Sequence, residues 1–100
     1  MTKVYIAGPI TGRDDYEEKF FDAEARLKEI GLEPMNPIRE GLVEGWNYKD
    51  YIDRGLRMLM ECDAVLLLEG WENSVGAKLE ERYAYICGLE RFRFGGFNND

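Results

Sequence analysis

The 100 residues include 13 lysines and arginines, 20 aspartates and glutamates and no histidine, which gives a formal net charge of −7 at pH 7. A chain of this length forms one domain with a modest core, and 45% hydrophobic residues are typical of a globular fold. The lack of histidine excludes histidine-ligated metals and Ser-His or Cys-His catalysis, and the acidic balance argues against a nucleic-acid-binding surface. If the protein is an enzyme, we expect carboxylates to carry the chemistry, with no metal and no organic cofactor.

The sequence predicts neither a membrane segment nor a targeting segment. The longest apolar run, residues 64–68, is much shorter than the roughly 20 residues that span a bilayer. A strand-like segment begins at residue 3, which leaves no room for a signal peptide, so we expect a cytoplasmic protein. The two cysteines, Cys62 and Cys87, do not suggest a disulfide framework, and both are predicted to be small buried hydrophobic residues.

The first third of the chain predicts a strand, a helix and a second strand. Residues 3–7 are β-branched and aromatic and end at a Gly-Pro pair, which predicts a strand followed by a turn. Apolar residues then recur at helical spacing over residues 16–30, and Gly31 is the expected glycine at the end of this helix. Residues 32–35 predict a short second strand.

The second half repeats this alternation. Asn47 is the expected N-cap of a helix over residues 48–62, and the continuously apolar residues 64–68 predict a central strand covered on both faces. Ser74 is the expected N-cap of a third helix. The residues of this helix that are predicted to face the core are Leu79, Tyr83, Ile86 and Cys87.

The alternation as a whole predicts a single α/β domain over residues 1–100. Residues 91–94 supply a fourth strand, and residues 95–100 are expected to be a frayed tail. The expected fold is a small open parallel sheet of about four strands with crossover helices, of the flavodoxin or Rossmann-like class. Such sheets bind ligands at the carboxyl ends of their strands, so the site is expected at the loops over residues 8–14 and 69–73.

Glu80 is the strongest candidate for a catalytic residue. It shares a helical face with the small residues Gly76, Ala77 and Ala84, a spacing that places a carboxylate in a small-residue concavity near a helix start. The same spacing also fits an ordinary exposed glutamate. Ser74 is accounted for first as an N-cap, and its hydroxyl and the free amides after it would also suit a phosphate.

Three segments form a recognisable pattern: Val4 to Ile10, Cys62 to Val65, and Gly70 to Ala84, with Ser-x-Gly-Ala-x-x-Glu as the most specific part. Together they resemble the nucleoside 2-deoxyribosyltransferase superfamily, in particular its short phage and bacterial branch. The resemblance covers residues 3–88. It implies an enzyme that transfers or hydrolyses the N-glycosidic bond of a nucleoside or its 5′-monophosphate, without a cofactor. It also implies a homo-oligomer, for which the expected interface aromatics are Trp46, Phe92, Phe94 and Phe97.

The resemblance also implies roles for individual residues. Glu80 matches the nucleophile that attacks the anomeric carbon, and Tyr5 matches the tyrosine that orients it. The other matched positions imply substrate contacts, at Gly8, Pro9, Ile10, Ser74, Gly76 and Ala77. A serine at position 74 is typical of the related nucleotide N-glycosidases and favours a nucleotide substrate. Arg13 is a further candidate phosphate contact, on its charge alone.

One position departs from the superfamily pattern. Members commonly carry an aspartate eight residues before the position of Asp63 to handle the leaving base, and this chain has Gly55 there. The nearest carboxylate, Asp53, lies two residues early, and about 200° of helical rotation would point it away from the site. Asp63 itself is expected to cap the third strand. The sequence leaves open which group protonates the leaving base: Asp53, Asp63 or another group.

The glycine at position 55 also leaves the function open. Without an aspartate to protonate the leaving base, the chain is expected to be slow on ordinary nucleotides, and Gly55→Asp is expected to raise their turnover. Space for a bulkier base would be one reason for a glycine at this position. Two alternatives to an enzyme remain: a nucleotide-binding protein that keeps the pocket without turnover, and a structural oligomer without a ligand.

Overall fold

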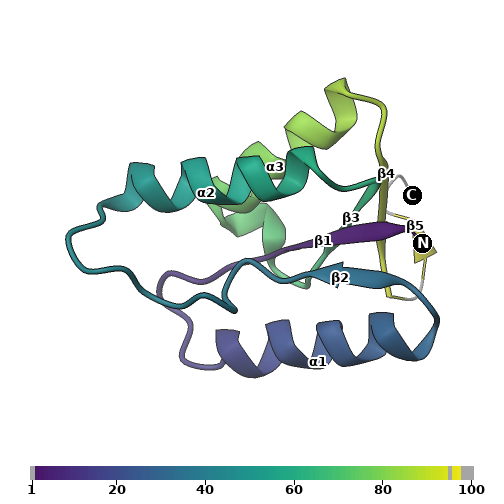
Figure 1. Cartoon of the computed structure of the whole chain (residues 1–100), viewed down its shortest axis with the longest axis horizontal. Helices are drawn as coiled ribbons and strands as arrows, with labels where there is room; N and C mark the ends of the chain where they lie inside the picture. The colour runs from purple at the N-terminus through teal and green to yellow at the C-terminus, as the bar shows by residue number, and fades with distance from the viewer. Residues whose placement is uncertain (1, 95, 98–100) are drawn as a thin grey trace.

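The computed structural model describes residues 2–94 and 96–97, which form a five-stranded sheet with helices on both faces (Figure 1). The strands are β1 (Lys3–Ala7), β2 (Glu33–Met35), β3 (Ala64–Leu67), β4 (Glu90–Arg93) and β5 (Gly96–Phe97). The helices are α1 (Tyr16–Glu29), α2 (Tyr48–Met60) and α3 (Val75–Ile86), and a 3₁₀ turn, η1 (Trp71–Asn73), precedes α3. None of the helices in this described part of the chain is long and apolar enough to cross a membrane.

The sheet has the strand order β2-β1-β3-β4-β5. The first four strands are parallel, which confirms the predicted open parallel sheet with crossover helices. The predicted frayed tail was wrong in part, because Phe97 pairs with Phe92 and Gly96 with Arg93 in an antiparallel ladder. The free edge of β4 offers unpaired backbone groups that a returning segment can bond. The rest of that tail, residues 95 and 98–100, lies outside the described residues.

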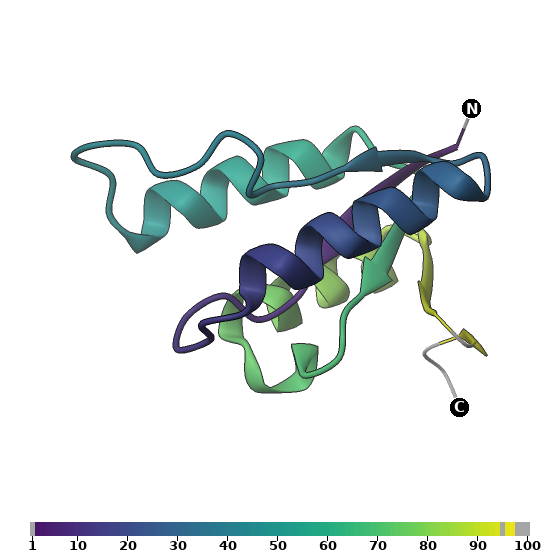
Figure 2. The ribbon, with the colours of Figure 1, turned by 90° about the horizontal axis from the view of Figure 1, so that it is seen from below.

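Alternate residues of the central strands face two separate hydrophobic clusters. Val4, Ile6 and Leu66 pack with α1 on one face of the sheet. Tyr5 and Val65 point to the other face, which α2 and α3 cover (Figures 1 and 2). β3 is buried along its whole length, as its continuously apolar sequence predicted. The side of the sheet to which a β1 residue points therefore decides which helices it meets.

The predicted core face of α3 was wrong for three of its four residues. Leu79 and Ile86 are 43% and 72% exposed, and Cys87 is exposed as well. The buried face of α3 consists of its small residues and one glutamate: Gly76, Ala77, Glu80 and Ala84. Small side chains fit here because α3 packs closely against β1 and β3, where larger ones would hold the helix away. Cys62 is buried, as predicted, and Tyr83 packs partly buried against the core.

The predicted interface aromatics are for the most part not freely exposed. Phe92 and Phe94 are half-buried against the cluster on the α1 side, where the Arg26 guanidinium stacks on the Phe94 ring. Trp46 is 37% exposed and packs edge-to-face on Tyr51. These rings are therefore engaged within the chain. The side chain of Phe97 lies outside the described part of the structure.

The strand order reverses direction between β1 and β3, and this is the position at which open parallel sheets bind ligands. β2 is short and pairs only with Lys3, Val4 and Tyr5 of β1. Within the described residues, the end of β1 therefore has no strand neighbour on the β2 side. This leaves an opening between α1, α2 and the start of α3.

Candidate active site

A buried hydrogen bond joins β1 to α3. The Tyr5 hydroxyl donates to Oε2 of Glu80 across 2.6 Å, and the two residues are only 1% and 8% exposed. Tyr5 reaches α3 because odd-numbered residues of β1 point to that face of the sheet, and Glu80 reaches β1 because its neighbours on the buried face are small. The fold thus brings together the two residues to which the resemblance gave the roles of orienting tyrosine and nucleophile.

Burial changes the protonation of both residues. The pKa of Glu80 is raised from 4.5 to about 7, because burial disfavours the charged carboxylate, while the hydrogen bond from Tyr5 acts in the opposite direction. The pKa of Tyr5 is raised well above its usual value of 10, first by burial and then by the neighbouring Glu80. Tyr5 therefore remains a donor, and Glu80 is divided between acid and carboxylate near neutral pH.

The Tyr5–Glu80 pair lies on a cavity of about 550 Å³. This volume is within the range of pockets that bind small organic molecules. α1, α2, the start of α3, the loop after β1 and the loop after β2 all contribute to its walls. The predicted site residues that line it are Tyr5, Gly8, Ile10, Ser74, Gly76, Ala77 and Glu80.

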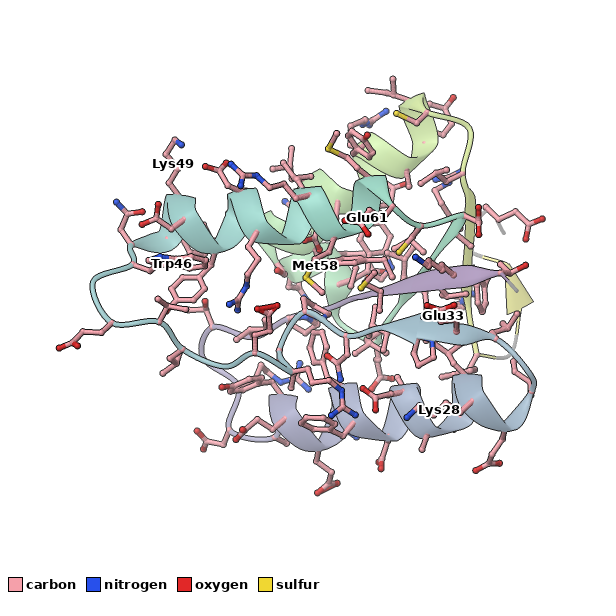
Figure 3. All side chains as sticks on the ribbon, in the orientation of Figure 1. Lys28, Glu33, Trp46, Lys49, Met58 and Glu61 are labelled. Atoms are coloured by element: carbon pink, nitrogen blue, oxygen red, sulfur yellow. The ribbon has the colours of Figure 1, made fainter. Side chains whose placement is uncertain are left out.

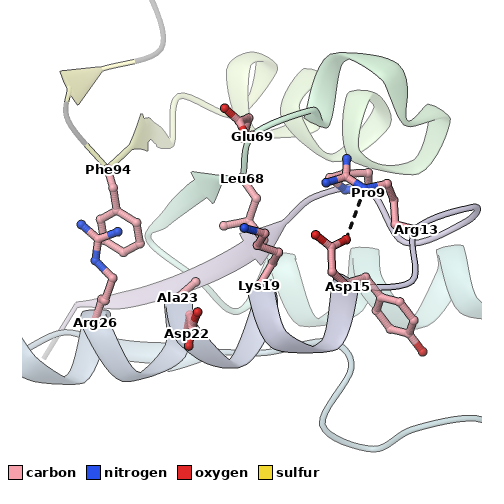
Figure 4. A pocket seen from close by; sticks show the side chains of 11 residues that line it. Pro9, Arg13, Asp15, Lys19, Asp22, Ala23, Arg26, Leu68, Glu69 and Phe94 are labelled. Carbon is pink, nitrogen blue, oxygen red and sulfur yellow. Dashed lines mark hydrogen bonds and ion pairs between the residues drawn. The ribbon is translucent and has the colours of Figure 1, made fainter.

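Pro9 and Arg13 lie apart from this cavity. They line a smaller hollow of about 200 Å³ that also contains Lys19 and Phe94 (Figure 4). There Arg13 forms an ion pair with Asp15 at 3.4 Å. The structure therefore does not bring Arg13 and the predicted phosphate-binding serine into one site.

The two candidate acids, Asp53 and Asp63, also lie elsewhere. Asp53 forms an ion pair at 2.7 Å with Lys49, which points outward from α2 (Figure 3). The carboxylate of Asp63 accepts a hydrogen bond from the backbone N–H of Lys3 at 2.9 Å, at the amino end of β3. This is the strand-capping position expected for Asp63, and it is the opposite end of the sheet from the cavity.

Gly55 of α2 packs directly on the Tyr5–Glu80 pair. A Cβ atom at this position would lie 2.6 Å from Oε2 of Glu80 and 2.8 Å from the Tyr5 hydroxyl oxygen. This contact explains why the interior of α2 contains a glycine, at a cost of about 1 kcal/mol relative to alanine. It also overturns one expectation, because a Cβ at position 55 would meet the Tyr5–Glu80 pair, so Gly55 does not open space for a base at that position. The effect of Gly55→Asp on turnover stays a prediction, and any side chain there requires the Glu80 carboxyl or the Tyr5 hydroxyl to shift.

Ser74 has the predicted N-cap role. Its hydroxyl oxygen accepts a hydrogen bond from the backbone N–H of Ala77 at 3.2 Å. The capped end of α3 faces the cavity, since Ser74, Gly76 and Ala77 all line it. The hydroxyl is therefore both a structural acceptor and part of the cavity wall.

The sequence reasoning missed one wall of the cavity, the loop over residues 36–47. Nη2 of Arg54 donates to the carbonyl oxygens of Pro37 and Gly41, at 3.4 and 3.0 Å. The Tyr51 hydroxyl bonds both the N–H and the carbonyl of Val43. Together these contacts hold the loop to α2. One signal in the sequence could have shown that α2 faces the cavity beside this loop. The cavity-facing residues of α2 recur at helical spacing, as Tyr48, Tyr51, Ile52 and Gly55.

The start of the same loop is held to α1. The buried carboxylate of Glu24 accepts a hydrogen bond from the Asn36 side chain at 3.1 Å and forms an ion pair with Arg39. Lys28 adds a second ion pair to Glu24 at 3.4 Å. The wall is therefore attached to one helix at its start and to another helix further along.

A protein-family model described as "Domain of unknown function (DUF4406)" matches residues 2–91. Two solved structures share the fold. The "2-desoxiribosyltransferase from Leishmania mexicana" has a TM-score of 0.71 and 21% identity, over 93% of this chain and 63% of that one. A 2-deoxyribosyltransferase from Bacillus psychrosaccharolyticus has a TM-score of 0.69 and 19% identity, over 89% of this chain and 69% of that one. No curated protein matches the sequence.

Proposed function

This chain belongs to the DUF4406 family, and we propose that it breaks the N-glycosidic bond of a nucleoside or its 5′-monophosphate, with Glu80 as the nucleophile. The sugar then passes to a second base or to water. The observation that carries the proposal is the buried Glu80 carboxyl, held by Tyr5 on a cavity of ligand size. The proposal places the chain in the short phage and bacterial branch of the nucleoside 2-deoxyribosyltransferase superfamily.

In this proposal the two oxygens of Glu80 have different tasks. Tyr5 bonds Oε2, which leaves Oε1 for the substrate. Oε1 forms a bond to the anomeric carbon while the carbon–nitrogen bond breaks, and the electron pair of the broken bond leaves with the base, which takes up a proton from water. A nitrogen of a second base or a water oxygen then attacks the same carbon and releases the carboxylate, as in retaining glycosidases.

Protonation decides how much of the protein is active. Only ionised Glu80 can attack, and its pKa of about 7 leaves a substantial fraction ionised at neutral pH. A carboxylate in a buried, weakly polarisable site also stabilises the positive charge that develops on the sugar ring more strongly than it would in water. The rate is therefore expected to rise with pH through the neutral range.

A nucleotide-binding protein without turnover is the second candidate, and Gly55 favours it. At this position α2 offers no acidic side chain to protonate the leaving base, and general acid catalysis is typically worth about 10²–10⁴-fold. The loss of such a group would slow the chemistry without affecting the shape of the cavity.

Base release from a panel of deoxynucleosides and their 5′-monophosphates, followed by chromatography, tests the proposal. We expect release by the wild type and none by Glu80→Gln, with unchanged circular dichroism. Glu81→Gln is the matched control, because Glu81 is adjacent on α3 but pairs with Arg91 instead of lining the cavity. Binding without release by the wild type would select the second candidate. Neither binding nor release would favour a structural oligomer.

We also propose that the protein is a homo-oligomer, as the resemblance implies. Apolar side chains on α3 are available for such an interface: Val75, Leu79 and Ile86 are 70%, 43% and 72% exposed. Multi-angle light scattering during gel filtration measures the mass directly, and a monomer at high concentration would contradict this proposal.

A further inference from the structure

The walls of the cavity carry an uneven set of charges. Among the described residues that line it, Arg54 is the only cation, whereas Glu17 and Glu80 are both carboxylates. Glu17 is exposed in the first turn of α1 and takes part in no ion pair between described residues. Its carboxylate is therefore available to a ligand that enters from the α1 side.

Arg54 is already engaged in holding the wall. Its guanidinium donates to the carbonyls of Pro37 and Gly41 and lies 5.0 Å from the centre of the Trp46 ring. Binding an anion through Arg54 would compete with these contacts. Arg13 and Lys19 line the separate hollow and do not line this cavity (Figure 4). The cavity is thus poorly supplied with free positive charge.

We propose that Glu17 is a specificity-determining residue of this cavity, one that disfavours ligands with a phosphate group and favours uncharged ligands that present N–H or O–H donors. The inference rests on the proposed function, because it concerns the same cavity. An ionised carboxylate can only accept hydrogen bonds, so it matches the amino and hydroxyl groups of a nucleoside. A phosphate held in the cavity close to Glu17 would be repelled by its carboxylate, since like charges within about 10 Å repel even at moderate ionic strength.

The cap of α3 supports the opposite expectation. Ser74 and the amides that follow it are the groups that the resemblance associates with a phosphate, and Ser74 lines the same cavity. However, the Ser74 oxygen already accepts a hydrogen bond from the N–H of Ala77. The Glu17 carboxylate therefore predicts a preference for the uncharged ligand, whereas the capped end of α3 predicts a preference for the phosphorylated ligand.

The chain offers a matched control for Glu17. Glu18 is its neighbour in the first turn of α1, is exposed as well, and does not line the cavity. Glu17→Gln and Glu18→Gln each remove one negative charge from the same helix end, so their effects on helix stability should be similar. Only Glu17→Gln changes the charge of the cavity wall.

The experiment measures, by calorimetry, the dissociation constants of a deoxynucleoside and its 5′-monophosphate, with the Glu80→Gln protein as parent to prevent turnover. We expect the parent to bind the nucleoside about tenfold more tightly, a preference of about 1.4 kcal/mol. Glu17→Gln should remove most of this preference, Glu17→Lys should reverse it, and Glu18→Gln should leave it unchanged.

Three results would overturn the inference. The first is tighter binding of the monophosphate by the parent, and the second is a preference that is the same with and without the Glu17 carboxylate. In both cases the ligands bind, so the proposed function survives. The third is no binding of either ligand together with no base release by the wild type, which would refute the proposed function as well.

Discussion

The hydroxyl of Tyr5 bonds one oxygen of the Glu80 carboxyl across 2.6 Å, and both residues line the cavity. Gly55 packs against the same pair so closely that a Cβ at its position would lie 2.6 Å from Oε2 of Glu80. Three separate elements, β1, α2 and α3, thus hold one carboxyl group. Its position and its protonation follow from these few contacts and from its burial.

Tyr5→Phe should move the pH dependence of catalysis. The hydrogen bond from Tyr5 lowers the pKa of Glu80, so its removal raises that pKa further. The acidic limb of the kcat/KM profile should therefore shift to higher pH, and the rate at neutral pH should fall about 10–100-fold, the scale of a hydrogen bond to a charged group. A slower enzyme with an unmoved profile would mean that Tyr5 serves only packing.

Glu80→Gln should stabilise the protein at alkaline pH. The pKa of Glu80 is about 7 in the folded state and close to 4.5 in the unfolded state, so the folded state binds more protons between these values. The stability of the wild type should therefore fall as pH rises from 5 to 8, by up to about 3 kcal/mol from this group. Glutamine does not ionise, so the variant does not lose stability in this way as the pH rises.

Urea unfolding of both proteins at pH 5 and pH 8 measures this effect. The free energy of unfolding of Glu80→Gln should exceed that of the wild type by more at pH 8 than at pH 5. An equal difference at both pH values would show that ionisation of Glu80 does not lower the free energy of unfolding.

Gly55→Ala should destabilise the protein although alanine favours helices. The new methyl group would lie 2.6 Å from Oε2 of Glu80, and overpacking of this kind typically costs about 1–3 kcal/mol. Gly76→Ala is the control, because its Cβ would lie farther from its nearest neighbours, at 3.1 Å from Ile52 and 3.2 Å from Tyr48. Thermal unfolding should show the larger loss for Gly55→Ala, and the reverse order would contradict the described contact.

Ser74→Ala should lower stability by about 1 kcal/mol, because the cap to the N–H of Ala77 is lost. If Ser74 acts only as a cap, the preference between nucleoside and monophosphate should stay unchanged. If Ser74 contacts a phosphate, the monophosphate alone should weaken, by about 1–3 kcal/mol. Measurement of both affinities together with the unfolding free energy separates the two roles.

The sequence was most informative where structure is encoded locally. The capping residues Asn47 and Ser74 follow from side-chain chemistry at helix starts, and the parallel sheet follows from the alternation of strands and helices. The buried face of α3 was missed because apolar spacing gives most weight to large side chains, whereas close packing on the sheet selected Ala77 and Ala84. Only the tertiary structure could reveal that this face of α3 requires small side chains.

The site was only partly accessible to sequence reasoning. Tyr5 and Glu80 are 75 positions apart, so their contact followed from resemblance and not from any local pattern. The contact of Gly55 with that pair, and the anchoring of the loop by Arg54, depend on how α2 lies over the sheet. No spacing rule within α2 contains that information.

The wall over residues 36–47 is attached by two kinds of interaction. At Glu24 the attachment is ionic, and its partners Arg39 and Lys28 are 59% and 61% exposed. Further along, the Tyr51 hydroxyl holds the wall through hydrogen bonds to the backbone of Val43. Dissolved salt weakens ion pairs whose cations are exposed and has little effect on the hydroxyl contacts. Raising the ionic strength should therefore loosen one end of the wall only. The affinity of an uncharged ligand, which salt does not affect directly, would then report how much this end of the wall contributes to binding.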